Sequence, residues 1–400
     1  MVQMITVLEV VERFLRLTLS WPVGRGRLAT LLGVHVLPYF FGVTVVLPLA
    51  CLGLHSSTMQ RVDLVSDAAA TSLCFFKLRC MQSHARTLLA ARHLLEDHFT
   101  ALELPVQAEA AAANAHCARR TNRLAKGYVL VYSSLSISGM AIMGLSVLSG
   151  DPRDRKLTTR TPEAVLREDY LFWPCLLGIG VELYLFPIAT GIFDALFLTL
   201  CLHISCKCDI LCLLLRHFRS GREGALRAVA DVPPSSERGA VTRAQDCVVY
   251  HQLIIRLHHM TESIFFRVTL LQTIYILIGV GTPILRITNG TLSDDPYKLT
   301  FALAYACWNI CQLLTFCWFG DIVAEKTANL SEEASAAFEP SLGTRGRGAG
   351  ADGVCLHLMI LRAQRPLYLT AGRFINLTLR LCLDIMKRSY SLYSALNRLK

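Results

Sequence analysis

The sequence has 400 residues, of which 53% are hydrophobic and only 18% are charged, and its formal net charge is +10. Soluble domains are about a quarter charged, so this composition argues against a soluble protein, and its apolar content excludes a disordered chain. A secreted scaffold held by disulfides is also excluded, because 15 cysteines are too few for this length. We therefore predict an integral membrane protein.

Residues 1–20 interleave charged and apolar side chains, so we expect no cleavable signal peptide. Their apolar residues share one helical face, which predicts an amphipathic helix before the first span. Seven later segments are long and apolar enough to cross a bilayer, which takes about 20 residues. These segments are 28–54, 64–81, 128–148, 176–200, 264–285, 299–319 and 374–393. The predicted fold class is all-α, a single seven-helix membrane domain over residues 1–400, without the internal repeats of many transporters.

The distribution of lysine and arginine indicates a cytoplasmic N-terminus and an extracellular C-terminus. In this orientation the more basic segments face the cytoplasm, namely residues 1–27, 82–127, 216–263 and 320–365. Their positive charge would face the anionic inner leaflet of the bilayer. No motif resembles a nucleic-acid-binding module. Of the glycosylation sequons at Asn289, Asn329 and Asn376, this orientation places Asn289 outside, where it would be modified.

The chain lacks the motifs of common enzymes, including a His-Glu-x-x-His helix, a nucleophile elbow and a Walker A loop. Cys206 and Cys208 lie in an apolar run, where free cysteine behaves as a small hydrophobic residue. His251, His258 and His259 are most simply interpreted as a solvated cytoplasmic helix face, rather than a metal site. The glycine-rich stretch 343–353 is interpreted as a linker. We expect no enzymatic activity, cofactor or metal.

The last predicted span is the most informative, because polar residues recur along it every three or four positions. Read as one helix, the polar stripe comprises Arg373, Asn376, Arg380, Asp384, Lys387, Ser391, Ser394 and Arg398. The opposite side is apolar and includes Phe374, Ile375, Leu379, Cys382, Leu383, Met386, Tyr390 and Tyr393. Each charge in a span costs at least ~2.5 kcal/mol, so the stripe must face partners or water. Either it forms a polar seam inside the bundle, with Arg380 paired to Asp384, or it lines an aqueous ion path.

The same region resembles a known family. The run from Gln364 to Gly372 (Gln-Arg-Pro-Leu-Tyr-Leu-Thr-Ala-Gly), followed by Met386-Lys-Arg-Ser-Tyr-Ser-Leu-Tyr-Ser-Ala-Leu396, resembles the C-terminal signature of insect odorant receptors. Upstream, the run from Gln312 to Gly320 is similar to the sixth span of that family. Further similar positions are Asn329-Leu-Ser331, Phe338-Glu-Pro340, Asp194, His251 and Phe76-Lys77.

This resemblance implies a seven-helix, ligand-gated non-selective cation channel in the plasma membrane of olfactory neuron dendrites. It further implies that the chain is an odorant-binding subunit and assembles with the odorant co-receptor, as a heterotetramer. The seventh helix, within residues 366–400, would line the pore. The pore and gate residues would be Arg380, Asp384, Lys387, Ser391, Ala395 and Leu396.

The resemblance also implies an odorant site among the outer halves of the second, third, fourth and sixth spans. Small volatile ligands need an apolar, concave pocket with few polar groups. The residues expected to face it are Ala70, Thr71, Cys74, Ile142, Met143, Ser146, Tyr184, Pro187, Ile188, Tyr305 and Trp308. None is charged, which argues against strongly ionised ligands.

Two other receptor classes stay open on the sequence alone. A G-protein-coupled receptor would need an extracellular N-terminus, and the chain lacks an Asp-Arg-Tyr after the third span and an Asn-Pro-x-x-Tyr in the seventh. A gustatory receptor, a related type of channel, differs mainly around Ser389-Tyr390-Ser391.

Overall fold

The computed structural model describes residues 42–50, 58–99, 106–148, 169–231, 244–288, 296–338 and 349–398, and these are almost entirely helical. The helical elements are η1 (Gly42–Val46), α3 (Leu47–Ala50), α4 (Thr58–Ser83), α5 (Ala85–His93), η3 (Leu94–His98), α7 (Gln107–Leu148), α9 (Asp169–Asp231), α10 (Ala244–Thr288), α11 (Pro296–Phe338), α12 (Ala349–Ala363) and α13 (Leu379–Arg398). Two short strands, β1 (Thr370–Ala371) and β2 (Ile375–Asn376), separate α12 from α13.

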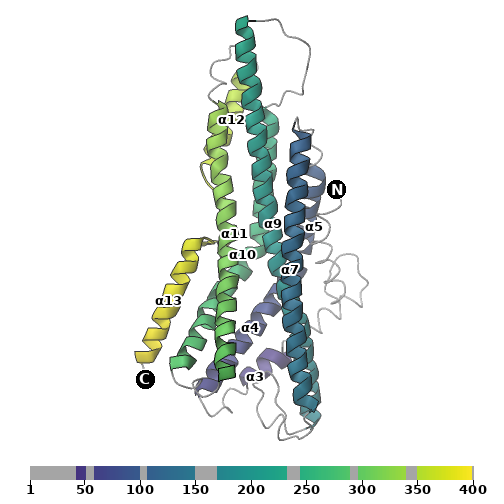
Figure 1. The fold of residues 1–400 in the computed structure, drawn as a ribbon, viewed down its shortest axis with the longest axis vertical. Coiled ribbons are helices and arrows are strands. Elements are labelled where there is room, and N and C mark those ends of the chain that lie inside the picture. The colour runs from purple at the N-terminus through teal and green to yellow at the C-terminus, as the bar shows by residue number, and fades with distance from the viewer. Residues whose placement is uncertain are drawn as a thin grey trace.

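The long helices α7, α9, α10 and α11 have 42, 63, 45 and 43 residues. Because a span takes about 20 residues, each helix extends well beyond one membrane thickness, and together they form the elongated bundle of Figure 1. Among the described residues, the stretches Leu176–Gly221 and Ala306–Phe338 are long and apolar enough to cross a membrane. The predicted spans 64–81, 128–148, 176–200, 264–285 and 299–319 all lie inside helices. Most of the predicted first span, 28–54, lies outside the described residues.

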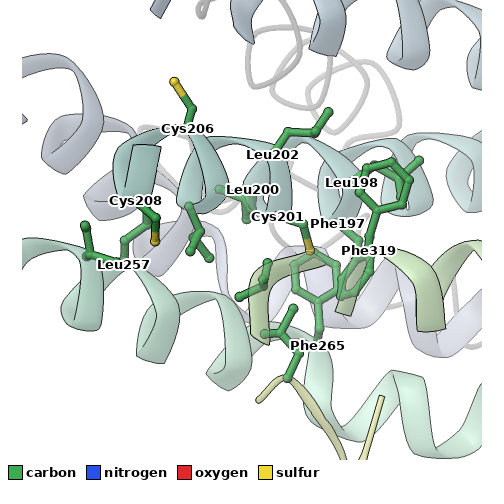
Figure 2. Close-up of a cluster of buried hydrophobic side chains, with 14 of the residues drawn as sticks. Phe197, Leu198, Leu200, Cys201, Leu202, Cys206, Cys208, Leu257, Phe265 and Phe319 are labelled. Carbon is green, nitrogen blue, oxygen red and sulfur yellow. The ribbon is translucent and has the colours of Figure 1, made fainter. Parts of the chain in front are cut away.

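Helix α9 forms the centre of the bundle and packs against α4, α7, α10 and α11. Every residue from Ala189 to Cys208 is buried, as expected for a helix that is apolar on all sides. In the core, Phe197 of α9 stacks on Phe316 of α11, with ring centroids 4.4 Å apart, and meets Phe265 of α10 edge-on at 5.1 Å. Figure 2 shows Phe197 and Cys201 close to Phe265, whereas Cys206 points away from this cluster.

The prediction of one continuous helix from Arg373 onward is wrong at its beginning. Gly372 and Arg373 both have φ of 67°, in the left-handed region, which no right-handed helix can accommodate. They form the turn between β1 and β2, in which Thr370 pairs with Asn376 and Ala371 with Ile375. The helix starts only at Leu379, so Arg373 and Asn376 do not belong to the polar stripe.

The interpretation of residues 343–353 as a linker also needs correction, because residues 349–353 belong to α12. Glycine costs a helix about 1 kcal/mol relative to alanine. In α12 tertiary packing outweighs this preference: its apolar side chains Leu356, Met359 and Ala363 are buried, and the helix packs against α10 and α11.

Candidate functional site

A buried polar network joins four helices in the interior of the bundle. Lys77 of α4 donates from Nζ to Asp194 Oδ1 of α9 at 2.7 Å, and both side chains have no exposed surface. The second carboxylate oxygen of Asp194 accepts hydrogen bonds from Tyr132 OH of α7 at 3.0 Å and from Gln312 Nε2 of α11 at 2.6 Å. Gln312 also donates to Tyr132 OH at 3.2 Å. Each helix contributes one member, so the network fixes the four helices at a common level.

The surroundings of the network exclude water and hold its members in place. The Lys77 ammonium lies 5.5 Å from the centre of the Phe193 ring, within range of a cation–π interaction. Gly191 allows the Tyr132 ring to lie directly against α9, because a Cβ atom there would come within 2.7 Å of that ring. A buried charge that loses its partner costs several kcal/mol, so Lys77 and Asp194 each depend on the other.

The predicted ligand residues on α4, α9 and α11 lie next to this network. Cys74 lies one turn before Lys77 and accepts a hydrogen bond from Thr190 Oγ1 at 3.2 Å. Trp308, one turn before Gln312, packs edge-on against Tyr132 with ring centroids 5.2 Å apart. Thr71 is buried on α4. Ala70, Pro187, Ile188 and Trp308 are half-buried.

On α4, α9 and α11, the network residue lies C-terminal to the predicted ligand residues. In the predicted orientation this is the cytoplasmic side. The offset from Trp308 to Gln312, for example, is four residues or about 6 Å. The network therefore borders the predicted ligand region on its cytoplasmic side.

One predicted ligand residue is placed wrongly by the sequence argument. The Tyr184 side chain is 54% exposed and does not face the bundle interior. At this level α7 approaches the backbone of α9, where Ser136 Oγ donates to the carbonyl oxygens of Leu183 and Tyr184 at 2.7 and 3.2 Å. The side chains of Ile142, Met143, Ser146 and Tyr305 lie outside the described residues.

The hairpin that precedes α13 is attached to α10. The Gly372 amide donates to the Phe266 carbonyl oxygen at 2.7 Å, and Thr370 Oγ1 donates to Glu262 Oε1 at 2.7 Å. The Arg373 guanidinium lies 4.5 Å from the centre of the Phe266 ring.

The same segment is attached to α11 at three levels. The Leu367 amide donates to Thr327 Oγ1 at 3.0 Å. The Leu379 amide, at the first residue of α13, donates to Asp321 Oδ2 at 3.0 Å. An acidic side chain at a helix N-terminus satisfies a free amide and complements the helix dipole. Next to Asp321, any Cβ atom on Gly320 would collide with the Leu377 carbonyl oxygen, so glycine allows this close approach.

Helix α13 packs on α10 and α11 through a narrow strip and is otherwise exposed. It lies at the edge of the bundle and diverges from α11 toward its C-terminal end (Figure 1). Its buried side chains, among those described, are Cys382, Ile385 and Ser389. The predicted pore residues Arg380, Asp384, Lys387 and Ser391 are all exposed. The side chains of Ala395 and Leu396 lie outside the described residues.

The interpretation of the stripe as a polar seam inside the bundle is therefore wrong. In the described part of the chain no ion pair joins Arg380 to Asp384, and both side chains are exposed. Part of the apolar side is exposed as well, since Leu383 is 59% exposed and Tyr390 66%. Two faces of α13, one polar and one apolar, point away from its own bundle.

The histidines of α10 differ from the predicted solvated face. His251 and His258 are buried, and loss of hydration lowers the pKa of each from 6.5 to about 4, so both are neutral at physiological pH. His259 is exposed. Ligand atoms of His258, His259 and Glu262 lie within 4.8 Å of one another, which makes this trio a possible metal-binding group among the described residues. One Glu262 oxygen is already engaged by Thr370 of the hairpin.

Comparison with known proteins identifies the family. The family model described as 7tm Odorant receptor matches residues 63–390. The chain belongs to this odorant receptor family. It is therefore a multi-pass membrane protein that acts as an odorant receptor.

Solved structures with a similar fold include the insect olfactory receptor OR5 from Machilis hrabei, alone and in complex with eugenol. Each has a TM-score of 0.74 with 14% sequence identity, and 98% of each chain is covered. No protein in the curated comparison matches the sequence significantly.

The sequence does not predict the receptor's buried network. Tyr132 is not singled out by any pattern, and Lys77, Asp194 and Gln312 are indicated only as positions that resemble the family. A stronger signal was present, because an ionisable residue within an apolar span needs a partner of opposite charge. Tyr132 and Gln312 carry no such signal, since neutral polar residues occur in membrane helices without forming a network.

Proposed function

We propose that this receptor is the odorant-binding subunit of a ligand-gated, non-selective cation channel, formed with the odorant co-receptor as a heterotetramer. It would act in the plasma membrane of olfactory neuron dendrites, with a cytoplasmic N-terminus and an extracellular C-terminus. Asn289, in an outer loop, would be glycosylated. The cytoplasmic segments would be 1–27, 82–127, 216–263 and 320–365.

The observation that carries the channel proposal is the exposed polar face of α13. Charged side chains in a membrane are stable only against partners or water, and Arg380, Asp384 and Lys387 form no ion pair with the described residues of their own bundle. A water-filled path between α13 helices of several subunits satisfies them. The exposed apolar face of the same helix would meet lipid or a neighbouring subunit. The gate would lie further along, at Ala395 and Leu396.

The ligand site would lie between α4, α7, α9 and α11, on the extracellular side of the Asp194 network. Thr71, Cys74, Ile188 and Trp308, with Ala70 and Pro187, would contact a small, mostly apolar odorant. Ile142, Met143, Ser146 and Tyr305 would complete the site from the same helices. Machilis hrabei OR5, with the same fold, has been solved with eugenol, and a small ligand of comparable polarity would suit these residues.

Helix α11 would transmit ligand binding to the pore. It carries Trp308 and Gln312 at the ligand site and, eight residues or about 12 Å further, Gly320 and Asp321 at the start of α13. A shift of α11 would therefore move the beginning of α13 directly. A ligand biases opening only through its difference in affinity for the two states. About 1.4 kcal/mol of difference changes the ratio of open to closed channels tenfold.

The proposal is tested by current recordings across an odorant panel, in cells expressing the receptor with and without the co-receptor. We expect odorant-evoked cation currents that need both chains. Arg380→Cys, Asp384→Cys, Lys387→Cys and Ser391→Cys should each become sensitive to a charged thiol reagent during odorant application. Leu383→Cys is the matched control: it is exposed on the apolar face and should not react. Failure of all four polar positions to react while current flows would refute the pore role of α13.

A further inference from the structure

A groove on the side of the bundle, between α7, α9 and α11, is not used by the proposed ligand site or pore. It encloses about 650 Å³. One part of its lining is basic, with His116, Arg119, Arg120 and Arg123 of α7. The other part is aromatic, with Tyr128 of α7 and Trp318 of α11, whose side chain is 55% exposed.

The basic residues form one stripe on α7. Their spacing of three and four residues places them on one face of α7. All four side chains are exposed. No acidic residue occurs among the described residues that line the groove, and no ion pair engages the three arginines in the described ranges. The groove is therefore complementary to an anion carrying more than one charge.

The groove also changes character along its length. The arginines precede Tyr128, the first residue of the predicted third span, and Trp318 lies at the end of the predicted sixth span. The basic part thus faces the membrane surface, while the aromatic part reaches the edge of the hydrocarbon. Tryptophan and tyrosine favour this boundary, and basic residues just outside it attract anionic headgroups of the cytoplasmic leaflet.

We infer that this groove binds an anionic phospholipid of the inner leaflet, with a phosphorylated headgroup of the phosphoinositide class. The arginines bind the phosphates, since the guanidinium group matches phosphate geometry with paired hydrogen bonds. The acyl chains lie along Trp318 and Tyr128. A free polyanion would satisfy the arginines but would leave this aromatic part unused. The inference rests on the membrane orientation in the proposed function, but not on channel activity.

A lipid in this position would bridge α7 and α11. Trp318 lies two residues before Gly320, where α11 meets the segment that leads into α13. The bound lipid would therefore stabilise one position of α11 relative to α7 and bias the channel between its states.

The test uses the purified full-length receptor assembled with its co-receptor. Binding of a fluorescent phosphatidylinositol bisphosphate is compared with that of phosphatidylcholine. The groove variant is Arg119→Gln/Arg120→Gln/Arg123→Gln. The charge-matched control is Arg86→Gln/Arg256→Gln/Arg365→Gln, at exposed arginines outside the groove. Each basic residue near an anionic surface contributes about fivefold in affinity. We expect at least tenfold weaker phosphoinositide binding for the groove variant and less than twofold for the control.

A second measurement locates the acyl chains. Phosphoinositide with brominated chains should quench tryptophan fluorescence in the wild type, and much less in Trp318→Phe. Equal loss of binding in the two arginine variants would overturn the inference. So would full competition by soluble inositol polyphosphate at matched concentration, which indicates a free polyanion site. Quenching unchanged in Trp318→Phe also overturns it. Both lipid-binding measurements need no channel current. A receptor that passes both of them but gives no odorant-evoked current would therefore refute the proposed function and not the lipid site.

Discussion

The buried pair of Lys77 and Asp194 allows a sharp test of the bundle core through Asp194→Asn. This change keeps the side-chain shape but leaves the ammonium of Lys77 without a counter-charge, at a site with no exposed surface. Removing one partner of a buried ion pair costs about 3–5 kcal/mol. For 400 residues, with an unfolding entropy of about 2.1 cal/mol/K per residue, that corresponds to a Tm lower by about 4–6 °C.

The assay is thermal unfolding of the detergent-solubilised receptor, followed by size-exclusion fluorescence. Asp209→Asn is the control, because Asp209 pairs with Lys326 at 2.7 Å on an exposed surface, where an ion pair contributes at most about 1 kcal/mol. The double variant Lys77→Met/Asp194→Leu should recover much of the loss, since no unpaired charge remains and Gln312 still bonds Tyr132. An Asp194→Asn Tm equal to that of Asp209→Asn would refute the buried-pair reasoning.

Three further changes probe the attachment of α13 and the α10 histidines. Asp321→Ala removes the cap on α13, which contributes about 1 kcal/mol, and should shift the odorant dose–response curve at normal surface expression. An unchanged curve would contradict the coupling through α11. Gly320→Ala should reduce surface expression strongly, because its Cβ atom collides with the backbone before α13. Gly353→Ala is the control and should not reduce it, because its Cβ atom would lie 3.8 Å from the nearest neighbour. Equal expression of the two variants would contradict the close approach. The lowered pKa values of His251 and His258 predict that stability falls as pH drops from about 6.5 to about 4, since these histidines take up protons there only in the unfolded chain. Tm measured at several pH values should depend less on pH in His251→Asn/His258→Asn than in the wild type. An identical dependence would contradict the burial of both histidines as neutral groups.

Helix α11 connects the proposed ligand site, the basic groove and the segment that leads into α13. Trp308 and Gln312 lie at the proposed ligand site, Trp318 lines the basic groove, and Gly320 and Asp321 contact the segment that leads into α13. All of them lie on α11, so a displacement of this helix at one of these points also moves the others. A single element that both sites bias is the physical requirement for coupling between them.

The sequence by itself determined the second to sixth predicted spans, and the polar stripe of the last helix from Arg380 onward, because these depend on residues close together along the chain. Apolar runs of membrane length can satisfy their backbone groups only as helices, and a spacing of three or four fixes which side chains share a face. The resemblance in the C-terminal segment also indicated the family.

Only the tertiary structure decided which face of each helix meets which neighbour. Lys77 and Asp194 are 117 residues apart in sequence, and no local pattern shows that they meet. The burial of His251 and the outward direction of Tyr184 likewise depend on what packs opposite them. Periodicity fixes the angle between side chains on one helix but not the rotation of that helix in the bundle. That rotation is set by the packing of all its neighbours at once, so the network and the free faces of α13 appear only in the folded chain.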